Sequence, residues 1–142
     1  MASNTAPTMW LRQVALVAKA RDPVRHEIFE LFGLDSDFED EGVSVFGLHN
    51  SVMTIGDTFL EIVAPTQADT TAGRLLERMG GDGGYMILVQ TDDIDFYRSQ
   101  TEKLAVRKIW QADRAEVKAL QMQPKDQGTN NAPKNPAHQQ HQ

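Results

Sequence analysis

A single carboxylate stands inside an otherwise apolar, strand-like run. In residues 58–63 (TFLEIV), Glu61 alternates with Phe59 and Val63, so these side chains are expected on one face of a strand, toward the concave side of its sheet. Burial raises the pKa of a carboxylate, which suits Glu61 to act as a general base. The alternative is a glutamate at a solvated cavity mouth or beside a cation, and both readings stay open.

Gln13 is the second polar group on an apolar strand. It lies in residues 11–18 (LRQVALVA), where it shares a face with Ala15 and Val17. Its amide fits a hydrogen-bonding residue in a cavity better than a metal ligand.

Further candidates for contacts to a ligand are polar or aromatic residues on other expected strands. His49 and Asn50 lie in FGLHN, and Met86 and Gln90 lie on one face of residues 85–91 (YMILVQT). For each of these, a hydrogen-bonding or packing role in the core is the simpler alternative. The candidate ligand-binding residues are Gln13, His49, Asn50, Phe59, Met86, Gln90 and Trp110, and the aromatic residues Trp10, Phe46 and Tyr85 are further candidates to line a cavity.

Composition excludes several classes of function. The chain of 142 residues has a net charge of −6 without a basic cluster, so no nucleic-acid partner is expected. It contains no cysteine, which removes thiol chemistry. No run approaches the roughly 18 apolar residues of a membrane helix, so we expect a cytoplasmic protein without a membrane partner.

The expected elements occur in the same order twice. The first set is a strand at 11–18, a helix from Asp22-Pro23 to Gly33 with Val24, Ile28, Leu31 and Phe32 on one face, extended chain at 43–55, and a hairpin through Gly56-Asp57 to 58–63. A capped helix at 70–79, with Leu75, Leu76 and Met79 inward, connects the first set to the second. The second set is a strand at 85–91, a helix from Asp92-Asp93 to about Leu104, and strands at 106–111 and 117–122. Gln13 stands opposite Met86 in this duplication.

The duplication divides the chain. We expect an N-terminal extension at 1–10, a first module at 11–66, a connecting helix and Gly-rich loop at 67–84, a second and incomplete module at 85–126, and a tail at 127–142. The tail is rich in Gln, Asn, Pro and His and has no apolar residue larger than Ala, so it is expected to be disordered.

The segments FGLHN, TFLEIVAP, GGDGGYMILVQTDDI and QPKDQG, in this order on a duplicated module, resemble the vicinal oxygen chelate superfamily, in particular its glyoxalase-like and bleomycin-resistance-like domains. The resemblance covers about 11–128. It implies an α+β fold in which paired βαβββ modules form a half-open barrel of mixed sheet around one cavity. In metal-dependent members, the first strand of each module supplies a His or Gln ligand and the last strand supplies a Glu.

Carried over position by position, the resemblance matches Gln13 and Glu61 but gives Met86 where a His would be expected. A last strand would follow the QPKDQG turn, and the polar tail stands there instead, so the final strand of module two is missing by sequence. The uncovered edge favours a homodimer.

The resemblance therefore implies a protein that binds a small molecule in the barrel cavity, without a tightly bound metal or other cofactor and with Glu61 as candidate general base. Whether it turns its ligand over stays open. One alternative is a metal-dependent lyase, isomerase or dioxygenase with a divalent ion on Gln13 and Glu61. Another is a degenerate, non-enzymatic copy that acts only by association.

Overall fold

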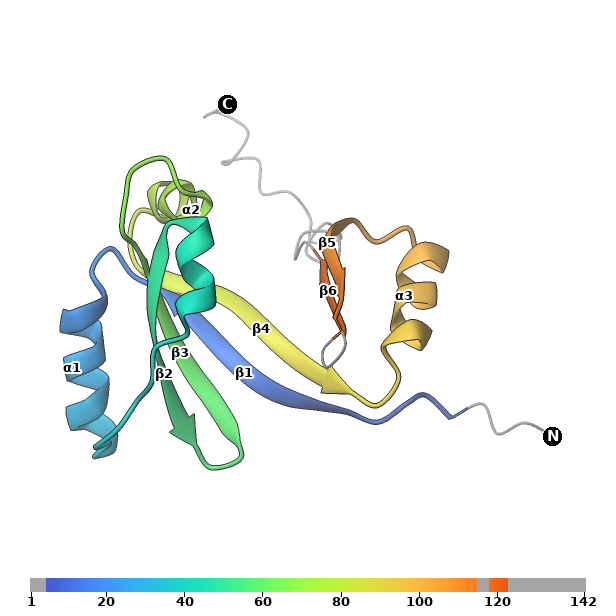
Figure 1. Cartoon of the computed structure of the whole chain (residues 1–142), viewed down its shortest axis with the longest axis horizontal. Coiled ribbons are helices and arrows are strands. Elements are labelled where there is room, and N and C mark those ends of the chain that lie inside the picture. Colours follow the sequence, from blue (N-terminus) through green and yellow to red (C-terminus); the bar gives the residue numbers. More distant parts are fainter. Residues whose placement is uncertain (1–4, 115–117, 123–142) are drawn as a thin grey trace, which may run out of the picture. The chain divides into compact units, whose positions relative to one another are not determined.

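The computed structural model describes residues 5–114 and 118–122 and divides into two compact units (Figure 1). The first unit comprises residues 9–90. The described residues of the second are 5–8, 91–114 and 118–122.

A four-stranded mixed sheet forms the first unit. Its order is β2-β3-β1-β4, with β1 at Met9–Val17, β2 at Leu48–Ile55, β3 at Thr58–Pro65 and β4 at Gly83–Thr91. β1 runs parallel to β3, whereas β2 and β3 form the expected antiparallel hairpin, with Gly56 at φ 57° in its turn. A left-handed backbone of this kind favours glycine.

Helix α1 (Arg21–Phe32) covers one face of this sheet. Ala18, Met53 and Ile62 are fully buried on that face, and Ile28 of the helix packs against them. The helix ends at Gly33, as expected, but Asp22 does not cap it, because the N-cap residue is Ala20.

The apolar face of α1 also differs from the expected one. Val24, Ile28 and Phe29 pack against the core, whereas Leu31 is 75% exposed and Phe32 is 55% exposed. The sequence does not distinguish the two faces here, because Ile28, Phe29, Leu31 and Phe32 are all apolar and point to adjacent sides of the helix.

Helix α2 (Thr71–Met79) packs on the other face, at one end of the sheet. Thr70 caps it, since its hydroxyl accepts a hydrogen bond of 2.9 Å from the Gly73 N–H. Leu76 is buried with Val17 and Val63. Met79, expected to point inward, is 42% exposed.

The expected extended chain at 43–55 is wrong in its first part. Residues Glu41–Phe46 form a 3₁₀ helix, η1, and β2 begins at Leu48. The Asp40 carboxylate caps η1 by accepting from the Gly42 N–H, and Gly47 ends it with φ 70°. These two local signals outweigh the strand preference of the valines in this segment.

The second unit contains α3 (Ile94–Lys103) and the antiparallel strands β5 (Lys108–Asp113) and β6 (Lys118–Met122). Asp93 caps α3 as expected, by accepting from the Phe96 N–H at 3.1 Å. Arg98 joins the helix to the hairpin through the Asp113 carboxylate at 2.9 Å and through backbone carbonyls of both strands.

The duplication expected from the sequence is confirmed in the order of the elements. β1-α1-β2-β3 is followed, after α2, by β4-α3-β5-β6. The α+β class with mixed, open sheet is confirmed as well. The position of the missing last strand and the polar tail lie outside the described residues. Within those residues, no helix has the length and apolar character needed to cross a membrane.

Candidate functional site

Four of the predicted site residues share the sheet face that lies opposite α1: Gln13, Asn50, Phe59 and Glu61. Gln13 pairs with Phe59 in the β1–β3 register, and Ala15 pairs with Glu61. Because paired residues of adjacent strands point to the same side, Gln13, Phe59 and Glu61 lie on one face, as the alternation in TFLEIV predicts. Val63, the next residue on this face, packs against α2.

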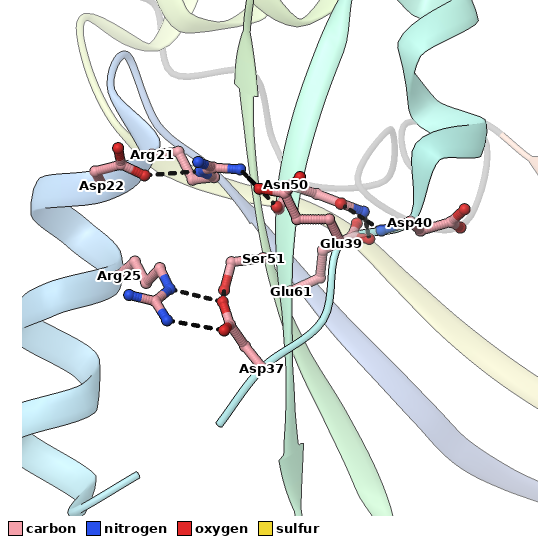
Figure 2. Close-up of polar contacts among 9 residues, drawn as sticks. All are labelled: Arg21, Asp22, Arg25, Asp37, Glu39, Asp40, Asn50, Ser51 and Glu61. Atoms are coloured by element: carbon pink, nitrogen blue, oxygen red, sulfur yellow. Dashed lines mark hydrogen bonds and ion pairs between the residues drawn. The ribbon is translucent and has the colours of Figure 1, made fainter. Parts of the chain in front are cut away.

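Asn50 holds the Glu61 carboxylate in place. Its side-chain Nδ2 donates a hydrogen bond of 2.9 Å to Glu61 Oε2 (Figure 2). Asn50 is only 1% exposed, and its Oδ1 accepts a second hydrogen bond of 2.9 Å from the Asp40 backbone N–H. Both the nitrogen and the oxygen of the amide thus contact protein atoms, whereas the sequence suggested Asn50 as a contact to a ligand.

Burial raises the pKa of Glu61 above its ordinary value. The negative charge of Asp40 acts in the same direction, while the amides of Asn50 and Gln13 oppose it by stabilising the carboxylate. Burial is the largest of these effects, so the Glu61 carboxylate binds a proton more readily than a glutamate in water.

Tyr85 of β4 belongs to the same environment. It packs beside Val17 and Val63, and both its burial and the charge of Glu61 raise its pKa. Since consecutive strand residues alternate in direction, this places Tyr85, rather than Met86, on the side of Glu61. From the sequence, Tyr85 was a candidate only to line a cavity with its ring. Its phenol hydroxyl adds a hydrogen-bonding group near Glu61.

Two arginines of α1 fix the loop that carries Asp40. Arg25 donates two hydrogen bonds, of 2.6 and 2.8 Å, to the Asp37 carboxylate, which also accepts from Ser51 (Figure 2). Arg21 pairs with Glu39 and donates to the backbone carbonyl of Asn50 at 3.1 Å.

These ion pairs were not predicted from the sequence. Residues 35–41 form an acidic turn in which the sequence alone identifies no partner for Asp37 or Glu39. The available signal was the spacing of Arg21 and Arg25, which places two cations one helical turn apart on one side of α1.

Asp37 is the most strongly perturbed carboxylate of this loop. Its hydrogen bonds from Arg25 are the main cause that lowers its pKa to about 2, with a further contribution from Ser51, while burial opposes the shift. The loop is therefore anchored by a carboxylate that stays ionised throughout the physiological range.

His49 lies apart from Glu61. It alternates with Asn50 along β2 and lines a hollow of about 310 Å³ together with Glu39, Asp40, Glu41, Val43, Ser44, Leu48 and Asn50. A second hollow of about 440 Å³ is lined by Lys19, Pro65, Gly73, Leu76, Glu77 and Gly80. Glu61 is not among the residues that line either of these two hollows, and it is half-buried.

Phe59, Gln90 and Trp110 lie on three different strands, β3, β4 and β5. Phe59 packs edge-on against Phe38, with ring centroids 6.1 Å apart, and carries the Arg12 guanidinium 4.7 Å from its ring centroid. Gln90 is exposed near the end of β4. Trp110 is on β5, in the other compact unit, and is 47% exposed.

The described residues do not fit a divalent metal ion. No group of three or more His, Cys, Asp or Glu side chains that could share an ion occurs at 5–114 and 118–122. Gln13 and Glu61 would offer oxygens, but Met86, at the position where the resemblance expects a His, carries a thioether and alternates with Tyr85 to the other side of β4. Moreover, the Asn50 amide donates to Glu61 Oε2, so one carboxylate oxygen is already engaged.

Comparisons with known proteins identify the fold. No model of a known protein family and no curated protein matches this sequence. Among solved structures, a hypothetical protein from Bacillus halodurans C-125 is similar, with a TM-score of 0.72 and 14% identity over 84% of this chain and 88% of that one.

Two methylmalonyl-CoA epimerases are also similar. The enzyme from Mycobacterium tuberculosis has a TM-score of 0.68 and 16% identity over 90% of this chain and 87% of its own. The Streptomyces coelicolor enzyme, in complex with 2-nitronate-propionyl-CoA, has a TM-score of 0.67 and 19% identity over 85% of this chain and 91% of its own. The fold is therefore that of the vicinal oxygen chelate superfamily, as the sequence motifs indicate.

Proposed function

We propose that the sheet face around Glu61 binds a small carbonyl compound and that Glu61 acts as a general base toward it. The observation that carries the proposal is the hydrogen bond from Asn50 to Glu61 Oε2, on a carboxylate whose pKa burial raises. An oriented carboxylate with a raised pKa is suited to accept a proton near neutral pH.

The hydrogen bond from Asn50 distinguishes the two carboxylate oxygens of Glu61. Asn50 engages Oε2 and the Gln13 amide also stabilises the carboxylate; we assign the proton transfer to Oε1, the oxygen without a contact to Asn50. The Gln13 amide and the Tyr85 hydroxyl lie in the same environment and can donate to a carbonyl oxygen on which negative charge develops.

The substrate class is a carbonyl compound with an acidic C–H next to the carbonyl. Removal of that proton by Glu61 forms an enolate and a protonated Glu61. Return of the proton, or of a solvent deuteron that has replaced it on Glu61, to the same face restores the C–H bond with exchange at that centre. The similar structures include epimerases of methylmalonyl-CoA, a thioester whose stereocentre is next to the carbonyl, and this supports the choice of that compound as the first probe.

The proposed location can be tested by NMR titration of the full chain with methylmalonyl-CoA. We expect shifts concentrated on Gln13, Glu61 and Tyr85, and none at Glu27, which is exposed on α1. A Tyr85→Phe variant keeps the aromatic packing and should bind more weakly. Shifts confined to Lys19, Gly73 and Glu77, which line the other hollow, or no saturable shift with this thioester or with a 2-oxo acid, would contradict the proposal.

We also propose that the site works without a resident metal and that the chain forms a homodimer. The first rests on the donor set described above, and the second on the strand edge that the sequence leaves uncovered. Native mass spectrometry of untagged protein lacking residues 127–142 reports both properties. A stoichiometric divalent ion would overturn the first, and a monomer mass at micromolar concentration would overturn the second.

A further inference from the structure

The geometry points to Asn50 as a positioning residue for Glu61, with the backbone N–H of Asp40 as the group that sets its orientation. Asn50 touches no reacting atom in this scheme and acts through the carboxylate that it holds. The inference rests on the base function proposed for Glu61, and it names the groups that prepare Glu61 for that function.

The orientation of the Asn50 amide follows from the chemistry of its partner. A backbone N–H can only donate, so the Asn50 atom that lies 2.9 Å from the Asp40 nitrogen must be the carbonyl oxygen Oδ1. The NH₂ group then points the other way, to Glu61 Oε2 at 2.9 Å. Because an NH₂ group offers only protons in this contact, Oε2 is held as an acceptor.

The loop that supplies this N–H is itself anchored to α1. Asp37 is held by Arg25, and Glu39 is paired with Arg21. Arg21 also donates to the backbone carbonyl of Asn50, so the same side chain contacts both the loop and β2. These contacts fix the Asp40 N–H relative to β2, although Asp40 itself is exposed.

The groups that face Glu61 come from each neighbouring element. Gln13 stands on β1, Asn50 on β2 and Tyr85 on β4, and Asp40 contributes a charge from the loop. Of these, Asn50 has both a direct contact to the carboxylate and a second contact that fixes its own direction. An enzyme loses rate when its reacting group is misplaced by about an ångström, so such a device has a measurable effect.

A matched pair of variants isolates the backbone N–H. Asp40→Pro removes the N–H, and Asp40→Ala keeps it; both lose the carboxylate that caps Gly42 and that raises the pKa of Glu61. Asp40 has φ −95° and ψ 106°, an extended conformation that proline reaches with a change in φ of about 30° from its preferred value. Comparison of the two variants therefore cancels the effects of the lost side chain.

The first readout is the side-chain NH₂ signal of Asn50 in ¹⁵N–¹H spectra of the full chain. Wild type and Asp40→Ala should show one strongly downfield proton, bonded to the carboxylate. In Asp40→Pro we expect both protons to move toward the shifts of a free amide, and their exchange with water to accelerate at least about tenfold. Intact methyl signals of Met53 and Ile62 show that the Asp40→Pro variant is folded. Unchanged Asn50 signals in this folded variant would overturn the inference.

Asn50→Asp gives a second test that leaves the loop sequence intact. The new side chain can accept from the Asp40 N–H but has no NH₂ to offer Glu61. Because its negative charge raises the pKa of Glu61, the rates are compared at the optimum pH of each protein. Using methylmalonyl-CoA as the probe in D₂O, we expect the rate of α-proton exchange to fall at least about tenfold at nearly unchanged Kd, as for a misplaced base. An unchanged rate would overturn the positioning role. If wild type exchanges no proton, the base function fails, whereas the Asn50 signals still decide whether its amide is oriented as inferred.

Discussion

Asn50 and Glu61 meet across the β2–β3 hairpin, with Nδ2 of the amide 2.9 Å from Oε2 of the carboxylate. Asn50 is almost completely buried, whereas Glu61 retains partial access to solvent on the sheet face. A buried amide thus supports a carboxylate that a ligand can still reach. This relationship accounts for the orientation of Glu61 and leads to the predictions below.

Replacement of Glu61 by Gln should alter stability in a pH-dependent way. The raised folded-state pKa means that the ionised form disfavours folding: the contribution of Glu61 to stability is fully present below the ordinary glutamate pKa and is lost as pH rises through the folded pKa. Gln keeps an oxygen that accepts from Asn50 and cannot ionise. Urea unfolding should therefore show Glu61→Gln at least as stable as wild type at pH 7, with a smaller advantage at pH 4.

The opposite pH dependence of the stability difference between Glu61→Gln and wild type would contradict the burial of this carboxylate. A variant that becomes relatively less stable as pH rises from 4 to 7 would mean that the charge of Glu61 is favourably paired in the fold. Glu27→Gln, at an exposed position on α1, serves as the control and should show little change.

Asp37 should stabilise the fold through its ion pair with Arg25. Its pKa is lowered from 3.8 to about 2, so Asp37→Asn should cost about 2 kcal/mol at pH 7, given 1.36 kcal/mol per pKa unit. Because its pKa is lowered in the fold, Asp37 contributes this stability fully at pH values above the ordinary aspartate pKa. The contribution is lost as pH falls through the folded-state pKa of about 2. Unfolding measured from pH 7 downward should thus show the difference shrinking below about pH 4.

Asp35→Asn is the matched control for this measurement, since Asp35 is an exposed carboxylate in the same loop. It should change stability by less than about 0.5 kcal/mol. Equal losses in the two variants would show that Asp37 acts through the general charge of the loop and not through its contact with Arg25.

Gly47 is predicted to tolerate alanine much less well than Gly56. Both glycines have positive φ, 70° and 57°, so each alanine should cost about 1–2 kcal/mol from backbone strain. At Gly47 the new Cβ would also lie 2.8 Å from Cγ2 of Thr70, the residue that caps α2, while nothing lies within 4 Å at Gly56. Thermal unfolding should show the larger loss for Gly47→Ala, and equal losses would contradict this packing.

Met53→Ala and Leu31→Ala test which side of α1 faces the core. Met53 is fully buried beneath this helix and its truncation should cost about 2–5 kcal/mol. Leu31 is 75% exposed, so its truncation should change the free energy of unfolding by less than about 0.5 kcal/mol. A large loss at Leu31 would restore the helix face expected from the sequence.

Local patterns predicted the parts of the site that belong to single strands. The alternation in TFLEIV placed Glu61 with Phe59, and the register then joined them to Gln13. Period-two patterning is set by the backbone of one strand, so it can be recognised without knowledge of the neighbours. The duplicated order of elements was predictable for the same reason.

The contacts that fix the site could not be predicted, because they join residues distant in sequence. Arg25 meets Asp37 only after α1 folds over the sheet, and the Asp40 N–H meets Asn50 only after the loop closes. The error at 43–46 has a local cause: the valines favour a strand, but the Asp40 cap and the left-handed Gly47 favour η1. Propensity is a weak signal where capping and a glycine act together.

The most direct measurement is the exchange of the α-proton of methylmalonyl-CoA in D₂O, followed by ¹H NMR with wild type, Glu61→Gln and Glu27→Gln. We expect wild type and Glu27→Gln to exchange the proton at equal rates, and Glu61→Gln to be slower by about 10²–10⁴-fold, the range attributed to general base catalysis. Exchange that is as fast in Glu61→Gln as in wild type, or no exchange by wild type despite saturable binding, would contradict Glu61 as the base.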